Sequence, residues 1–347
     1  MDTITHGLVG AIVAQAAFSP KLGRKATLCG FVAGVLPDAY GLLRNAADPL
    51  FRMEYHRHFT HALAFVPLGG LLAMLPFLLT GWGRRDWKTL YLACALAYGM
   101  HAPLDIVTSY GTLLLWPFTW DRVKVDWMPI IDPLFTIPLL LFVIWSCVRK
   151  NARIAVVGIC VGLAYICLGA VQEWRGLQMQ ERLAASRGQT VERGRVLPTL
   201  GNLVVWRSIY VADGKIHADA LRLWMPGRTS YVPGGTVPLL TRPPNDPGMA
   251  ADLRARLARE FDRFSWFADG YVARSPQDPS VIADMRYTQE PQGIQSLWGI
   301  RLVPERQNAP VEWVRTGTWD RRRGLKELWA LVGGMSPKLR PWLPPRL

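Results

Sequence analysis

Residues 153–174 of this 347-residue chain read RIAVVGICVGLAYICLGAVQEW, with charged side chains only at the two ends. A helix crosses the hydrocarbon core of a bilayer in about 20 apolar residues, so this stretch predicts a transmembrane helix. Five stretches before it are apolar enough for the same interpretation: 4–20, 26–44, 61–82, 89–109 and 129–149. We therefore predict an α-helical membrane bundle of about six transmembrane helices over residues 1–174.

The composition changes after residue 174. Residues 175–347 hold 26 of the 40 Lys and Arg residues and 16 of the 26 Asp and Glu residues. Alternating apolar residues predict strands, and an apolar stripe at helical spacing predicts an amphipathic helix over 248–269. The predicted strands are 203–211, 215–224, 270–274, 282–288, 295–304 and 311–316. We expect residues 175–347 to form a soluble extracytoplasmic α+β domain with a mainly antiparallel sheet, with 225–249 and 336–347 irregular.

The net charge of +14 does not predict nucleic-acid binding, because the basic residues are scattered. The only tight run, Arg321-Arg322-Arg323, suits a solvated face or an anionic-lipid contact. All five cysteines fall in apolar segments without a CxxC pair, so we expect buried thiols rather than disulfides. The first apolar stretch lacks a basic n-region and a cleavage site, so we expect it to remain in the protein.

Orientation follows from the basic residues in short connections. Three compact connections carry them: Lys21, Arg24 and Lys25; Arg84, Arg85 and Lys88; and Arg149, Lys150 and Arg153. Since basic loops stay in the cytoplasm, this pattern predicts that both termini are extracytoplasmic. The chain would then be a multi-pass protein of the bacterial inner membrane, in contact with membrane lipids.

Five of the six histidines lie in the apolar half, close to aspartates. Ionisable groups are rare at membrane depth, and histidine with carboxylate is a ligand set that suits zinc. In the expected orientation these groups all fall near the extracytoplasmic ends of their segments. We predict one site for a divalent metal, Zn²⁺ by preference, with ligands from His6, Asp38, His56, His58, His61, His101 and Asp105.

The spacing supports shared ligation at two points. His101 and Asp105 are four residues apart and stack on one face of a helix, and His58 and His61 are three apart. Thr5, Thr60 and Thr108 are candidates to cap helices or to fix the second nitrogen of an imidazole. For catalysis, Asp2, Asp126 and Asp132 are candidate general bases, and Arg57 is a candidate clamp for a phosphate.

The ligand set suits metal-activated water that attacks an ester or phosphodiester, and the boundary location suits an amphiphilic, lipid-like substrate. Two alternatives stay open. A non-enzymatic membrane metal-binding or assembly protein needs the same ligands. A transporter needs polar residues through the whole membrane thickness, whereas the inner halves of segments 61–82, 129–149 and 153–174 are apolar.

Four motifs carry a family resemblance: Asp2-Thr3-Ile4-Thr5-His6-Gly7, Leu36-Pro37-Asp38, His56-Arg57-His58-Phe59-Thr60-His61, and His101-xxx-Asp105-xx-Thr108-Ser109-Tyr110-Gly111. With them, residues 1–150 resemble the YdjM-like bacterial inner-membrane proteins, which implies a metal-dependent hydrolase. A more distant likeness to zinc-dependent phospholipase C implies ligands at His6, Asp38, His61, His101 and Asp105, the last as a bridge between metals. The sequence departs from the nearer family at Tyr40, where members often carry a second acid, and at His58, where they often carry Gly.

Overall fold

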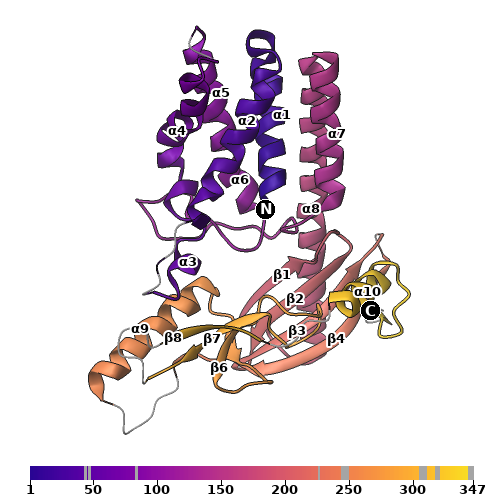
Figure 1. The fold of residues 1–347 in the computed structure, drawn as a ribbon. Helices are drawn as coiled ribbons and strands as arrows, with labels where there is room; N and C mark the ends of the chain where they lie inside the picture. Colours follow the sequence, from indigo (N-terminus) through magenta and orange to yellow (C-terminus); the bar gives the residue numbers. More distant parts are fainter. Residues whose placement is uncertain are drawn as a thin grey trace. The chain divides into compact units, whose positions relative to one another are not determined.

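The computed structural model describes residues 1–342 apart from 43, 44, 46, 47, 83, 84, 226, 244–249, 305–310 and 317–320. The chain forms two compact units. Unit 1 comprises Met1–Leu43, Tyr55–Val171 and Leu200–Asn202, and unit 2 comprises Arg44–Glu54, Gln172–Thr199 and Leu203–Leu347. Unit 1 is helical and unit 2 combines sheets with helices (Figure 1).

Unit 1 consists of α-helices joined by short 3₁₀ helices. They are α1 (Thr3–Leu22), α2 (Lys25–Val35), η1 (Leu36–Leu42), η2 (Phe59–His61), η3 (Leu63–Phe65), α4 (Val66–Leu79), α5 (Trp87–Gly99), α6 (His101–Ile106), α7 (Pro133–Arg149) and the first half of α8 (Ala152–Ser186). Small residues let α1 and α2 approach closely: a Cβ added to Gly30 would overlap the carbonyl oxygen of Gly10. Small side chains such as Ala93 and Cys94 likewise fill the core between α2, α4 and α5.

The expectation of about six transmembrane helices is wrong. Among the described residues, only α8 is long and apolar enough to cross a membrane as one helix. The pair Phe51–His61 and Leu63–Leu79, bent by 60°, makes a second span if it is counted as one. Three other predicted stretches are interrupted or short. The stretch 26–44 passes into 3₁₀ helix at Leu36, 89–109 breaks at Met100 between α5 and α6, and α7 has 17 residues.

The described residues of unit 2 form two antiparallel sheets. The five-stranded sheet has the order β1-β2-β3-β4-β9, and the four-stranded sheet has the order β5-β6-β7-β8. The strands are β1 (Arg193–Pro198), β2 (Val205–Ala212), β3 (Lys215–Leu223), β4 (Thr229–Pro238), β5 (Val272–Arg274), β6 (Val281–Asp284), β7 (Trp298–Leu302), β8 (Val311–Arg315) and β9 (Arg340–Pro341). The helices are α3 (Phe51–Glu54), the second half of α8, α9 (Ala251–Phe267) and α10 (Arg321–Val332).

The alternation of residues located most of these strands, and the amphipathic helix lies at α9. The prediction that 225–249 is irregular is wrong, because β4 runs through it and pairs with β3. Pro233, Gly234 and Gly235 hide this strand in the sequence, and the register shifts opposite them between His217 and Asp219. The tail is irregular except for β9. Residues 244–249 of the linker, 343–347 of the tail and the predicted loop residue Arg84 lie outside the described residues.

Candidate metal centre

Three imidazoles and two carboxylates converge in unit 1 from segments far apart in the sequence. The start of α1 supplies His6, η1 supplies Asp38, η2 supplies His61, and α6 supplies His101 and Asp105. Ligand atoms lie within 4.8 Å of one another in two groups that share His101: His6 with Asp38 and His101, and His61 with His101 and Asp105. As the spacing predicts, His101 and Asp105 lie on one face of a helix.

The distances around His61 and His101 suit ligands of one small cation. The two Nε2 atoms are 3.0 Å apart. Asp105 Oδ2 lies 3.3 Å from His61 Nε2 and 3.5 Å from His101 Nε2, and Asp38 Oδ1 lies 3.7 and 3.6 Å from the same atoms. A tetrahedral zinc site with bonds of about 2.0–2.2 Å separates neighbouring ligand atoms by about 3.3–3.6 Å. All five separations lie within about 0.3 Å of this range, so either carboxylate can complete a triangle of ligands with the two imidazoles.

Second contacts orient the ligands. His101 Nδ1 lies 2.7 Å from the carbonyl oxygen of Gly34, and since a carbonyl only accepts, the ring donates there. In the neutral ring this leaves the lone pair on Nε2, which faces the other ligands. His61 Nδ1 lies 2.9 Å from Thr60 Oγ1, and Thr3 Oγ1 donates to Asp38 Oδ2 at 2.9 Å.

Asp105 is the most enclosed member, with 1% of its side chain exposed. Oδ1 forms ion pairs with the amino group of Met1 and, at 2.9 Å, with Arg57. Burial alone would raise the pKa of Asp105, but Arg57, the Met1 amine and His6 outweigh it and hold the pKa well below its usual range. Within the described part of the chain, Oδ2 has no hydrogen-bond partner, although it is buried and faces both imidazoles. A buried anionic oxygen without a donor fits a site for a cation.

His6 lies against the same group. Its ring stacks on that of His101, with centroids 3.5 Å apart, and its Nε2 lies 3.0 Å from Asp105 Oδ1. Burial lowers the pKa of His6 to about 3, with His101 adding to the effect. The neutral imidazole, which is the form that binds metals, is therefore favoured.

The structure places two predicted ligands elsewhere. The ring of His56 contacts Tyr40 and Tyr110, and its carbonyl oxygen accepts a hydrogen bond from Arg122. His58 is buried among aromatic rings, whose centroids lie 4.9 to 6.0 Å from its own: Tyr55, Phe59, Trp116 and Trp120. Neither histidine belongs to a metal-sized group among the described residues.

The candidate bases have varied settings. Both oxygens of Asp2 accept hydrogen bonds from Thr5 at the start of α1. Asp132 caps α7 through the Leu134 amide and accepts a bond from Tyr165. Asp126 is buried with a positive φ of 58° and belongs to neither metal-sized group.

Arg57 lies inside the site. Its guanidinium pairs with the Asp105 carboxylate and donates to Thr108 Oγ1 at 2.8 Å, with 3% of the side chain exposed. In this arrangement Arg57 positions Asp105.

Sequence reasoning missed two supporting groups. Thr3 holds Asp38, and the carbonyl oxygen of Gly34 holds His101. The hydroxyl of Thr3, directly after Asp2, is a weak signal in the sequence. A backbone carbonyl leaves no signal, because every residue has one.

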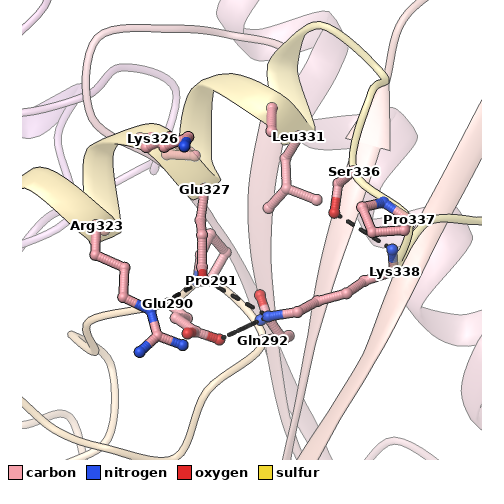
Figure 2. Close-up of a pocket in the computed structure, with 13 residues that line it drawn as sticks. Glu290, Pro291, Gln292, Arg323, Lys326, Glu327, Leu331, Ser336, Pro337 and Lys338 are labelled. Atoms are coloured by element: carbon pink, nitrogen blue, oxygen red, sulfur yellow. Dashed lines mark hydrogen bonds and ion pairs between the residues drawn. The ribbon is translucent and has the colours of Figure 1, made fainter.

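Unit 2 has a pocket of about 360 Å³, where α10 faces residues 290–292 and 336–338 (Figure 2). Both of its acidic side chains are paired within the pocket: Lys338 lies 3.7 Å from Glu290 and 3.6 Å from Glu327, and Arg323 lies 3.3 Å from Glu327. The pocket therefore offers no group of ligands comparable to the cluster in unit 1.

Comparison with known proteins bears on the same part of the chain. The sequence model of the YdjM inner membrane protein family matches residues 1–176, about half of the chain. The chain belongs to this family. The match contains every residue of the candidate metal centre, and it makes the chain an inner membrane protein.

Two curated proteins are similar to this member of the YdjM family. Inner membrane protein YbcI of Escherichia coli (strain K12) is 28% identical over 129 residues, which are 37% of this chain and 73% of the relative. The uncharacterized protein YfhP of Bacillus subtilis (strain 168) is 29% identical over 157 residues, which are 42% of this chain and 46% of that protein. The chain thus spans less than half the length of the second relative. No solved structure matches.

Proposed function

We propose that this YdjM-family protein is a membrane-embedded metal-dependent hydrolase. Its divalent ion, Zn²⁺ by preference, is held by His61 and His101 together with Asp38 and Asp105. His6 stacks on the ring of His101 beside these ligands. The substrate is an ester or phosphodiester of an amphiphilic, lipid-like molecule at the outer face of the inner membrane. The observation that carries the proposal is the approach of both histidine Nε2 atoms to 3.3–3.5 Å from a buried carboxylate oxygen that has no hydrogen-bond donor among the described residues.

When bound, such an ion lowers the pKa of a water toward neutrality and polarises a phosphoryl or carbonyl oxygen. The protein's own residues hold the geometry. The Gly34 carbonyl fixes the ring of His101, Thr60 contacts the ring of His61, and Arg57 holds Asp105 while balancing its charge. These supports let the ligands meet the ion without rearranging.

Asp38 marks the open side of the site. Its side chain is 23% exposed, whereas those of His61, His101 and Asp105 are at most 1% exposed. A polar headgroup therefore approaches from the Asp38 side, while the enclosed side limits access of bulk water. The carboxylate oxygen of Asp38 that is not aimed at the histidines accepts from Thr3, so that contact fixes its direction.

We further propose that this side is extracytoplasmic, with both termini outside. The support for the C-terminal side is the basic group Arg149, Lys150 and Arg153 at the first end of α8, since basic residues flank the cytoplasmic end of a span. For the N-terminal side the support is the basic group Lys21, Arg24 and Lys25 at the last end of α1. A membrane-impermeant maleimide applied to intact spheroplasts tests this on Lys215→Cys, in a background without native cysteines. Labelling before lysis supports the orientation, and labelling only after lysis refutes it.

Elemental analysis and turnover of the purified full-length chain test the main proposal. The parent protein should retain a near-stoichiometric divalent metal and hydrolyse members of a panel of lipid phosphodiesters and esters. Chelation should abolish both properties, and added Zn²⁺ should restore them. His101→Asn and Asp105→Asn should lose metal and activity, whereas His58→Asn should keep both. Full metal occupancy in the first two variants would refute the ligand set.

A non-enzymatic metal-binding or assembly protein is the second candidate, because the same ligands serve a structural ion. Metal retention without turnover of any substrate in the panel favours this candidate. A large fall in the thermal unfolding temperature on chelation, alongside absent turnover, would assign the ion to stability.

A further inference from the structure

The apolar part of helix α8 ends close to Trp174. From Ala152 to Trp174 the helix rises about 33 Å, which matches a bilayer core of about 30 Å. Basic residues stand at its first end, and the polar pair Gln172 and Glu173 follows the apolar run. Trp174, with 61% of its surface exposed, therefore lies at the level of the lipid headgroups.

Three hydrogen bonds fix the end of strand β3 and the turn after it to this same level of α8, and a fourth holds Leu203, just before β2. Gln172, which is buried, donates to the carbonyl oxygens of Leu203 and Leu223 at 2.9 and 2.7 Å. Arg175 donates to the carbonyl oxygens of Trp224 and Met225 at 3.3 and 3.0 Å. The turn that follows β3 is thus held beside the helix where the helix meets the membrane surface.

The side chains of that turn suit an interface. Trp224 is 45% exposed and Met225 54% exposed, so two neighbouring large apolar side chains face out of one turn. Contiguous exposed apolar groups mark contacts with partners or membranes. Arg222 lies over the Trp224 ring, 5.3 Å from its centroid, and Arg228 is exposed nearby. Tryptophan beside arginine is typical of the headgroup region, where an apolar ring and a cation both find partners.

We propose that Trp174, Trp224 and Met225 form a membrane-contacting rim that inserts into the headgroup layer of the bilayer. The partner is the lipid surface itself, and the exposed Arg228 contacts its phosphates, whereas the Arg222 guanidinium is held by the carbonyl oxygen of Val332. The rim gives unit 2 a second attachment besides α8, so that this end of the five-stranded sheet stays at the membrane. The inference is independent of the metal chemistry, since none of its residues belongs to the candidate metal centre.

Fluorescence quenching in nanodiscs tests the rim with the full chain. In a cysteine-free background, an NBD probe is placed at Met225→Cys or, as the matched control, at Lys215→Cys. Lys215 is an exposed residue at the opposite end of β3, about 26 Å along the strand. The discs contain phosphatidylcholine and phosphatidylglycerol with a nitroxide near the headgroup.

Quenching at position 225 should exceed that at position 215 at least threefold, with a blue-shifted emission at 225 alone. Weak quenching at both positions would overturn the rim. Strong quenching at both would overturn it as well, because the contact would not be confined to this turn. Should Met225→Cys fail to fold, Trp224→Cys gives the same comparison.

Discussion

Comparing the variants His61→Ala and His58→Ala tests whether His61 is a metal ligand. His58→Ala is the matched control, because His58 is a buried histidine outside the candidate metal centre. The two residues are three positions apart and nearly equally buried, with 2% of the surface of the whole residue exposed for His61 and 4% for His58. His61 Nε2 lies among Asp38, His101 and Asp105, whereas His58 lies among aromatic rings. Both variants leave a cavity of similar size, so both should lower the free energy of unfolding by comparable amounts.

Their metal affinities should differ sharply. A structural zinc site contributes about 10–16 kcal/mol through four ligands, so one ligand accounts for about 3 kcal/mol. That corresponds to a rise in the dissociation constant of about 100-fold or more for His61→Ala. The value for His58→Ala should stay within about twofold of the parent, well below the tenfold that 1.4 kcal/mol represents.

Competition with a fluorescent zinc chelator, performed on the full-length protein in detergent, measures both constants. Unfolding of the metal-free variants serves as the control for their stability. Equal loss of affinity in the two variants would show that the cluster reports on folding alone. An unchanged affinity in His61→Ala would remove His61 from the ligands and refute the geometric reasoning.

Three further predictions concern the supports of the site and of unit 2. Gly34→Ala should lower zinc affinity about tenfold or more without altering a ligand, because the new Cβ overlaps the carbonyl oxygen of His6; an unchanged affinity in the same chelator competition would contradict this. Asp132→Ala should cost about 1 kcal/mol of unfolding free energy through the lost cap of α7 while turnover persists, and a loss of turnover at full stability would instead make Asp132 catalytic. Burial lowers the pKa of His217 below its ordinary 6.5, so its contribution to stability is intact above pH 6.5 and is lost as the pH falls below it. Denaturant titrations between pH 7.5 and 5 should therefore show that the free energy of unfolding falls less with pH in His217→Phe than in the parent. An equal fall in both proteins would show that His217 does not cause the loss of stability.

The sequence predicted those features that depend only on residues close together in the chain. The four-residue spacing of His101 and Asp105 places both on one face of α6. Alternation in 203–224 predicts β2 and β3 because successive side chains of a strand point to opposite faces of the sheet, although in the structure both faces of β2 are buried. The apolar run of 153–174 likewise predicts the long helix α8.

Prediction was wrong where continuity of a helix mattered. Hydropathy is averaged over a stretch of residues, so it does not detect a break in the helix. Met100 separates α5 from α6, and the chain changes to 3₁₀ helix at Leu36. The same breaks bring His101 and Asp38 to the site, since they turn the chain where the ligands are needed. Strand β4 was missed because Pro233 and two glycines suggest a loop, although pairing with β3 overrides that local preference.

By itself, the sequence determined the inventory of the candidate site: histidines and aspartates in an apolar half, next to threonines that can orient them. It also determined membership of a membrane protein family through motifs that lie within residues 1–176. Only the tertiary structure decided which histidines meet. His61 and His101 are 40 residues apart in sequence, while His58, three residues from His61, lies in an aromatic cage. The candidate ligands meet because of how separate helices pack and where those helices break. Packing depends on the whole fold, so no single segment of the sequence shows it.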